Sequence, residues 1–337
     1  MNCFHYTLLL TFVGFSYNTM AQERKVFPET GAILRFDQAL DKIIDTNTRA
    51  EIIAEGFEWS EGPLWVPQHN MLLFSDVPKN TVYKWTEANG METYLSPSGY
   101  TGKMKSQSKE PGSNGLTLNE KGELVLCQHG NRQMARMDAP LNAPQPEFTT
   151  LAATYNGKKF SSPNDCAFNN KGELFFTDPP YGLPTQNDRD PSKELPFNGV
   201  YKLKKDGTIV LLTDSITRPN GIAFFPGHKK LLIANSDPAK PFWYMYDVNG
   251  DQLSNGKIFF HLKERERNWK GLPDGLKISK QGIVFATGPG GIYIFSKEGK
   301  KLGIIRLENP ASNCALSADE KTLFVTNDMY LLRIKLK

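Results

Sequence analysis

The chain has 337 residues, of which 39% are hydrophobic, enough to bury a substantial core within one domain. Its 40 basic and 36 acidic side chains nearly cancel, which leaves a formal charge of +4, and there is no long basic run with interleaved aromatic residues. These features argue against a two-domain split and exclude nucleic acid as an expected partner.

The chain begins with a segment typical of an export signal. Its first 22 residues contain no Asp, Glu, Lys or Arg, and the apolar stretch Tyr6–Tyr17 is too short to span a bilayer. Ala21 supplies a small residue for cleavage, so residues 1–21 are predicted to be a secretory signal peptide. The protein is then periplasmic or secreted and has no membrane span; an uncleaved anchor or a disordered start is the alternative.

Residues 22–49 are expected to form an N-terminal extension, with one short amphipathic helix around Phe36–Ile44. Three cysteines remain after cleavage: Cys127, Cys166 and Cys314. An odd number does not describe a disulfide framework, and free Cys commonly behaves as a small buried hydrophobe. We therefore expect three buried free thiols.

From residue 50 onward a short pattern recurs six times. Each copy has a polar residue, an apolar run, a polar turn and a second apolar run. The polar residues, called anchors below, lie 39 to 56 residues apart, which is typical of four-stranded β-propeller blades. The anchors are Glu61, Asn114, Asn164, Asn220, Asp274 and Asn313. The pattern predicts an all-β fold, a six-bladed β-propeller over residues 50–337.

The last copy ends just after its third strand, predicted at Tyr330–Lys335. Ala50–Ala54 can supply the missing fourth strand, which would close the ring and remove an open sheet edge. Two polar insertions, at residues 98–113 and 185–196, are expected to be loops that shape a binding site.

If each first strand runs through the central channel from its anchor, the anchors meet on one rim. Carboxylate and amide oxygens are the ligands that Ca²⁺ and other hard divalent ions prefer, and no His/Cys cluster indicates zinc. In any single copy, an Asn-Gly or Asp-Gly pair is explained equally well as a turn. Because six copies are in phase, we favour a metal site.

A second set of polar residues follows the second strands, which return to the same rim. Its members are Asp76, His129, Asp178, Asn235 and Asn327, with Thr287 in the fifth copy. His129 suits acid or base chemistry, although a hydrogen-bonded, orienting histidine is an equal alternative. Asp178 starts a Pro-rich segment that is expected to form a rigid rim loop, and a structural role for Asp178 is favoured over a catalytic one. Motifs of serine hydrolases, phosphate-binding loops and dinucleotide enzymes are absent from the sequence.

Seven motifs together resemble the family of gluconolactonase, senescence marker protein and luciferin-regenerating enzyme, in its bacterial gluconolactonase branch. They are Ser60–Pro63, Asn114–Leu116, Cys127–Arg132, Pro163–Asp165, Phe176–Gly182, Pro273–Gly275 and Gly288–Gly291. The resemblance extends from about Glu51 to Lys337 and implies a six-bladed propeller that hydrolyses lactones.

The resemblance also implies one divalent cation at the top of the channel, usually Ca²⁺, with Mg²⁺, Zn²⁺ and Mn²⁺ left open. Its expected ligands are Glu61, Asn164, Asn220 and Asp274. Expected substrate-binding residues are Asn114, His129, Asp178 and Asn313. Asp274 and His129 are the candidate catalytic bases, with Asp274 preferred.

The sequence therefore predicts an exported, divalent-metal-dependent lactonase that hydrolyses a gluconolactone-like sugar lactone. Its expected partner is this small molecule, and the protein is expected to be a monomer or a small homo-oligomer. Two alternatives stay open: a metal-dependent phosphotriesterase-like hydrolase, and a non-catalytic, calcium-stabilised propeller that binds sugar.

Overall fold

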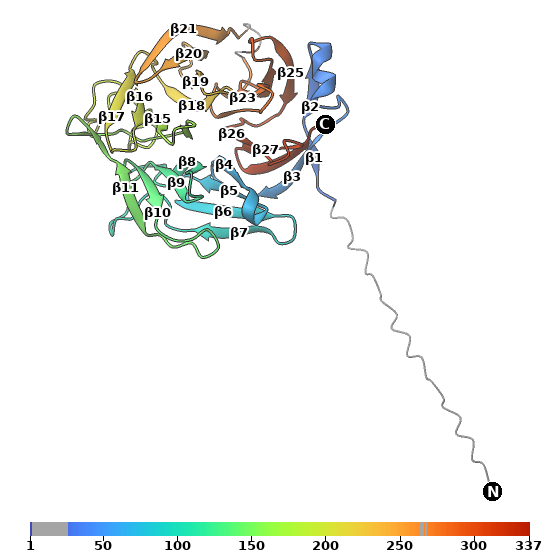
Figure 1. The fold of residues 1–337 in the computed structure, drawn as a ribbon, viewed down its shortest axis with the longest axis horizontal. Coiled ribbons are helices and arrows are strands. Elements are labelled where there is room, and N and C mark those ends of the chain that lie inside the picture. Colours follow the sequence, from blue (N-terminus) through green and yellow to red (C-terminus); the bar gives the residue numbers. More distant parts are fainter. Residues whose placement is uncertain (2–25, 263–265, 267) are drawn as a thin grey trace.

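The computed structural model describes Met1, residues 26–262, Glu266 and residues 268–337. Six antiparallel sheets surround a central channel, which confirms the predicted all-β, six-bladed β-propeller (Figure 1). The predicted signal peptide lies almost entirely outside the described residues. Within the described part of the chain, no helix has the length and apolar character needed to cross a bilayer.

Blades 1 to 5 are each built on four strands that follow one another in the chain, whereas blade 6 takes three strands from the C-terminus and one from the N-terminal part. Each first strand contacts the first strands of the two adjacent blades. Blade 1 comprises β4 (Ser60–Val66), β5 (Met71–Asp76), β6 (Thr81–Thr86) and β7 (Gly90–Leu95). Blade 2 comprises β8 (Ser113–Leu118), β9 (Leu124–Gln128), β10 (Gln133–Met137) and β11 (Phe148–Ala152). Blade 3 comprises β14 (Cys166–Phe168), β15 (Leu174–Asp178), β16 (Gly199–Leu203) and β17 (Ile209–Thr213).

The second half of the ring repeats this order. Blade 4 comprises β18 (Pro219–Phe224), β19 (Lys230–Asn235), β20 (Trp243–Asn249) and β21 (Gln252–Phe260). Blade 5 comprises β22 (Leu276–Ile278), β23 (Val284–Gly288), β24 (Gly291–Phe295) and β25 (Lys301–Arg306). Blade 6 takes β26 (Asn313–Leu316), β27 (Thr322–Asn327) and β28 (Tyr330–Lys335) from the C-terminus. A small hairpin, β12 (Thr154–Tyr155) and β13 (Lys158–Lys159), lies between blades 2 and 3.

The N-terminal strand β3 (Ala50–Glu55) completes blade 6. It pairs antiparallel with β28, and Ala54 lies opposite Leu331. The predicted closure of the ring is therefore confirmed, and it leaves the last blade without an unpaired third strand.

The segment before β3 also joins the sheets. Strand β1 (Glu29–Thr30) pairs with β3, and β2 (Ala32–Arg35) pairs with β25 as a fifth strand of blade 5. Between β2 and β3, the 3-10 helix η1 (Gln38–Lys42) occupies part of the predicted helical segment. A second 3-10 helix, η2 (Pro67–His69), forms the turn between β4 and β5.

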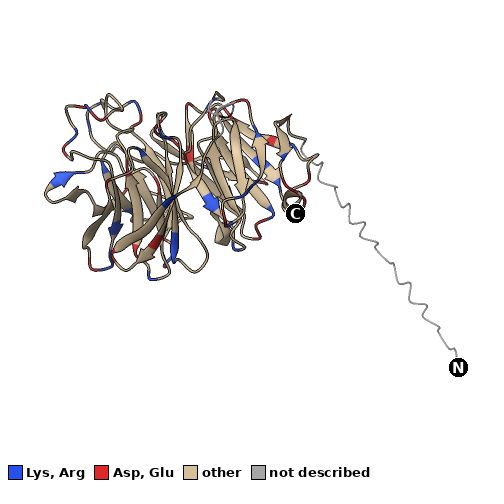
Figure 2. Cartoon of the chain, turned by 90° about the horizontal axis from the view of Figure 1, so that it is seen from above, with Lys and Arg blue, Asp and Glu red and all other residues tan. Residues whose placement is uncertain are grey.

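Apolar side chains fill the spaces between blades. Blades 4 and 5, for example, share a buried cluster in which Trp243 packs against Tyr293 and Phe295. The three cysteines are buried and free, as expected from their odd number. Figure 2 shows basic and acidic residues interspersed over the molecule, in agreement with the small net charge.

The glycine that follows an anchor allows adjacent blades to approach closely at the channel. A Cβ on Gly62 would lie 2.0 Å from the carbonyl oxygen of Asn114, the next anchor. A Cβ on Gly221 would lie 2.2 Å from the carbonyl oxygen of Asp274. The repeated Asn-Gly and Asp-Gly pairs therefore serve close packing between first strands, and the alternative that they only form turns is not supported.

Candidate functional site

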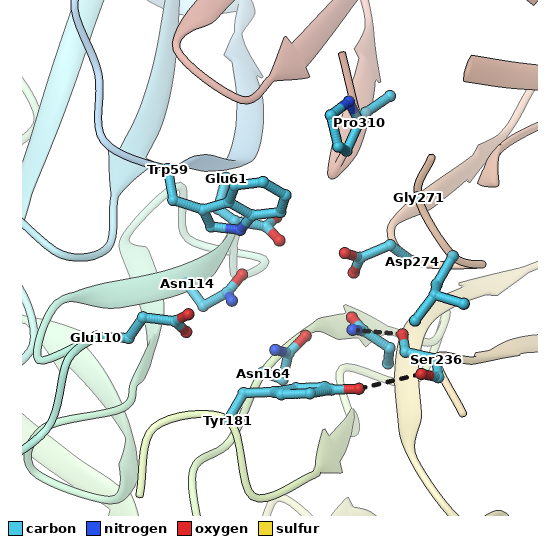
Figure 3. Close-up of a pocket in the computed structure, with 13 residues that line it drawn as sticks. Trp59, Glu61, Glu110, Asn114, Asn164, Tyr181, Ser236, Gly271, Asp274 and Pro310 are labelled. Atoms are coloured by element: carbon cyan, nitrogen blue, oxygen red, sulfur yellow. Dashed lines mark hydrogen bonds between the residues drawn. The ribbon is translucent and has the colours of Figure 1, made fainter. Parts of the chain in front are cut away.

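A cavity of about 370 Å³ opens at the end of the channel where the first strands begin (Figure 3). Five of the six anchors line it: Glu61, Asn114, Asn164, Asn220 and Asp274. Figure 3 shows the carboxylates of Glu61 and Asp274 on opposite sides of a common space, with the amides of Asn114 and Asn164 directed into it. The structure therefore brings all four expected metal ligands together.

The sixth anchor, Asn313, does not line this cavity. Its Oδ1 accepts a hydrogen bond from the N–H of Cys314 at 2.8 Å and lies 3.4 Å from the ammonium nitrogen of Lys277. Burial raises the pKa of Asp165, and the nearby Lys277 ammonium opposes that shift. Asn313 therefore lies beside Asp165 and Lys277 in the channel, and its side chain also interacts with Glu61, where it opposes the rise in the pKa of that carboxylate. It is not among the residues that line the cavity.

The two anchor carboxylates are buried in an environment that disfavours their charge. Burial raises the pKa of Glu61 to about 8, although the N–H of Gly62 donates a hydrogen bond to its Oε2 at 3.1 Å. Burial also raises the pKa of Asp274 well above its ordinary value, and the adjacent Glu61 carboxylate adds to the effect. A cation bound between the two groups would offset both effects.

The unpaired oxygens of the cavity fit such a cation. Among the described residues, Oδ1 of Asn114 and Oδ1 of Asp274 are buried without a hydrogen-bond partner. The amide of Asn220 is oriented by Ser236, whose Oγ accepts from Nδ2 at 2.9 Å and donates to the carbonyl of Pro273 at 2.6 Å. This arrangement turns Oδ1 of Asn220 away from Ser236.

Two carboxylates and two amides form a donor set made of oxygen only, which suits Ca²⁺ or another hard divalent ion. Residues 26–262, 266 and 268–337 contain no group of three or more His, Cys, Asp or Glu side chains that could hold a metal. This finding does not bear on the expected ligand set, because two of its four members, Asn164 and Asn220, are amides of a residue type outside that group.

The side chains of the second set of polar residues hold the backbone, a role that the sequence indicated for Asp178 only. Both carboxylate oxygens of Asp178 accept backbone N–H groups, from Ser161 at 2.9 Å and from Ser162 at 2.7 Å. The carboxylate of Asp76 accepts in the same way from the N–H groups of Glu58 and Trp59.

The two amide members of this set behave likewise. Oδ1 of Asn235 accepts the N–H of Arg218, and Nδ2 of Asn327 donates to the carbonyls of Asn309 and Pro310. Each of the four side chains fixes the backbone that leads into the first strand of its own blade. Asp178, expected to bind substrate, therefore lies outside the cavity, and its polar atoms are already occupied.

His129 also lies behind the cavity wall. It is fully buried. It follows Gln128, the last residue of β9, which pairs with Ser113 at the start of β8. Its Nδ1 is 3.6 Å from Oε2 of Glu110, a residue that does line the cavity. Glu110 therefore lines the cavity, whereas His129 contacts Glu110 and does not line it.

The lining residues that were not predicted include four with polar or aromatic side chains: Trp59, Glu110, Tyr181 and Ser236. Trp59 and Ser236 adjoin predicted positions, since Trp59 lies two residues before Glu61 and Ser236 follows Asn235. Tyr181 lies in the predicted rim loop, and its hydroxyl donates to the carbonyl of Ser236 at 3.3 Å (Figure 3). Glu110 lies in the insertion expected to shape the site, but the composition of that insertion did not single it out.

A family model, curated relatives and solved structures all indicate the same family for this chain. Residues 59–328 match the family described as SMP-30/Gluconolactonase/LRE-like region. A gluconolactonase of Zymomonas mobilis is 39% identical over 313 residues, which cover 91% of this chain and 86% of that protein. Regucalcin of Xenopus laevis is 25% identical and covers 82% of this chain and 85% of its own length.

A solved gluconolactonase structure from Xanthomonas campestris superposes with a TM-score of 0.78 at 27% identity. The match covers 94% of this chain and 99% of that one. The family resemblance drawn from the motifs is confirmed by these matches.

Proposed function

We propose, because the chain belongs to the SMP-30/gluconolactonase/LRE-like family, that it is an exported, divalent-metal-dependent lactonase acting on a gluconolactone-like sugar lactone. The observation that carries the proposal is the pairing of the buried Glu61 and Asp274 across a cavity whose amide and carboxylate oxygens have unpaired acceptor positions. Lactone hydrolysis is supported by the gluconolactonase of Zymomonas mobilis, and a divalent ion by the relationship to regucalcin.

Glu61, Asn164, Asn220 and Asp274 would hold the ion. When bound, a divalent ion supplies Lewis acidity, which polarises a carbonyl and favours attack by water. The protein's own residues bind and orient the substrate. The side chain of Asn114 can contact ring hydroxyls, and the rings of Trp59 and Tyr181 offer apolar walls for the face of a sugar ring.

A substrate panel tests this function. Metal-free protein is assayed with aldonolactones and phosphotriesters after addition of Ca²⁺, Mg²⁺, Zn²⁺ or Mn²⁺. We expect hydrolysis of an aldonolactone to depend on one of these ions and to be lost in Glu61→Gln. Asp206→Asn is the matched control, since Asp206 is an exposed turn residue between β16 and β17, at the opposite end of the blades.

Three results would contradict the proposal. Hydrolysis of phosphotriesters alone would favour the phosphotriesterase alternative. Lactone hydrolysis at full rate in metal-free protein would show that the activity does not require an ion. Thermal stabilisation by a lactone that is never hydrolysed would indicate a sugar-binding protein.

Export has its own test. Production of the full chain in a bacterial host, followed by N-terminal sequencing of the periplasmic protein, should show a mature chain that begins near Gln22. Recovery of only uncleaved protein from the cytoplasm would contradict export.

A further inference from the structure

Glu110 is a cavity carboxylate that lies outside the anchor pattern. It belongs to the loop between β7 and β8, and it lines the cavity with Glu61 and Asp274. Its side chain is 19% exposed, and Figure 3 shows the carboxylate directed toward the space shared by the anchors. Among the described residues that line the cavity, it is the one carboxylate outside the expected ion-binding set.

Two residues from other parts of the chain lie against this carboxylate. Nε2 of Gln186 donates a hydrogen bond to Oε1 of Glu110 at 2.8 Å. Nδ1 of His129 lies 3.6 Å from Oε2, the carboxylate oxygen that Gln186 does not contact. The loops at residues 98–113 and 185–196, which the sequence indicated as shaping the site, therefore meet at Glu110.

His129 has no competing polar contact in the described structure. It is completely buried, and neither of its ring nitrogens has a hydrogen-bond partner there. A buried imidazole without a hydrogen-bond partner destabilises the folded state. The adjacent Glu110 carboxylate is the group that can serve as this partner. A separation of 3.6 Å exceeds a normal hydrogen bond, but catalytic hydrogen bonds are often long in ligand-free structures and shorten when substrate binds.

Hydrolysis of a lactone requires a group that accepts a proton from the attacking water. His129 does not line the cavity, and Asp274 belongs to the set that would hold the ion. Glu110 faces the same space without belonging to that set. Its geometry therefore suits the proton acceptor better than either residue expected from the sequence.

We propose that Glu110 accepts the proton of the attacking water, and that His129 and Gln186 position its carboxylate. The inference rests on the proposed lactonase function. The water oxygen bonds to the carbonyl carbon of the lactone while its proton passes to Glu110. The bond between that carbon and the ring oxygen then breaks, and Glu110 returns the proton to the ring oxygen, which becomes the hydroxyl of the hydroxy acid product.

The test compares Glu110→Gln and Glu110→Ala with the wild type on an aldonolactone. Both variants should lose about 10²–10⁴-fold in kcat, the usual range for general acid–base catalysis, with little change in KM. Formate added to Glu110→Ala should restore part of the rate, because a small carboxylate can enter the space left by the side chain. Glu194→Gln is the matched control, since Glu194 lies on the other loop and its side chain is 41% exposed.

The outcomes separate this proposal from the proposed function. Stabilisation of both variants by the added ion, measured as a shift in Tm, should equal that of the wild type, which shows that the fold and the ion site are intact. A raised KM with unchanged kcat, or no rescue by formate, would overturn the role as proton acceptor. A wild type that hydrolyses none of the lactones would refute the lactonase function itself.

The positioning role of His129 is tested in a double-mutant cycle. His129→Asn should lower kcat roughly 10-fold in the wild type and have no further effect in Glu110→Gln, because residues that act through one another are not additive. Equal losses in both backgrounds would show that His129 acts independently of Glu110 and would overturn this part of the proposal.

Discussion

Asp and Asn side chains occur in two positions around the channel, and their hydrogen bonding differs. Five of the six anchors, which lie at or just before the start of the first strands, line the cavity, where Oδ1 of Asn114 and Oδ1 of Asp274 are unpaired among the described residues. At the ends of the second strands, both oxygens of Asp178 are satisfied by backbone N–H groups. Asn327 is satisfied too, since its Nδ2 donates to two backbone carbonyls.

The comparison shows that residue type and repeat position do not distinguish a binding group from a structural one. Folding occupies the polar atoms of the second-strand residues, and these atoms hold the loops that begin each blade. The anchor atoms stay available for a ligand, at the cost of buried, unpaired polar groups. Substitutions in the two sets should therefore have opposite effects on activity and stability.

The largest effect on activity is expected from Asp274→Asn. This change keeps the shape of the side chain but removes a charge from the expected ion-binding set, so lactone turnover should fall roughly 10²–10³-fold or more. The free energy of unfolding of the metal-free protein should not decrease, since burial already disfavours the charged form. Initial rates and urea denaturation measure the two quantities. Destabilisation without loss of turnover would reverse the roles assigned to the two sets.

Gly221→Ala should be strongly destabilising. Its new Cβ would lie 2.2 Å from the carbonyl oxygen of Asp274, so the first strands of blades 4 and 5 must separate. We expect a loss of about 1–3 kcal/mol in the free energy of unfolding, as for other overpacked sites. Activity should also fall, because the backbone of Asp274 shifts. An unchanged denaturation midpoint would show that adjacent blades part easily here.

Ser236→Ala tests whether a hydroxyl orients an anchor. Removal of Oγ releases Nδ2 of Asn220 and the carbonyl of Pro273. Groups that orient ligands of a metal typically contribute roughly 10–100-fold to affinity or activity. We therefore expect a loss of this size in the apparent affinity for the activating ion, measured by titrating activity with the ion. Ser236→Thr, which keeps the hydroxyl, should retain most of the affinity, and equal losses in both variants would contradict the orienting role.

Asp178→Asn should affect stability in a pH-dependent way while leaving the turnover of folded protein unchanged. Burial raises the pKa of Asp178 to about 6, so the folded protein holds this proton more tightly than the unfolded chain does. The raised pKa therefore adds up to about 3 kcal/mol to the free energy of unfolding below pH ~4, and this stabilisation is lost as the pH rises through 6. The stability difference between wild type and variant should therefore shrink from pH 4 to pH 7. Urea denaturation across this range measures it, and a constant difference would contradict the shift.

The sequence was sufficient to predict the fold. Repetition of the anchors specified six blades, and the missing outer strand after Tyr330–Lys335 indicated that Ala50–Ala54 closes the ring, as it does. The strands β1 and β2 could not be predicted, because they are short and join blades 6 and 5 from a segment outside the repeat.

The site was predicted only in part. The in-phase repeat brought Glu61, Asn164, Asn220 and Asp274 to one cavity. The same reasoning failed for Asp178, since repeat position does not show that backbone N–H groups occupy its carboxylate. Glu110 lies in a loop outside the repeat and contacts Gln186 of a loop 76 residues further along the chain, and no local pattern reveals such a tertiary contact.

Calorimetric titration of metal-free protein with Ca²⁺ measures ion binding at the anchors without relying on turnover. We expect the wild type and Asp178→Asn each to bind one ion at the cavity, whereas Asp274→Asn should bind it at least about 100-fold more weakly. Equal affinity in Asp274→Asn and the wild type, or loss of binding in folded Asp178→Asn, would contradict the assignment of the anchors as the ion site.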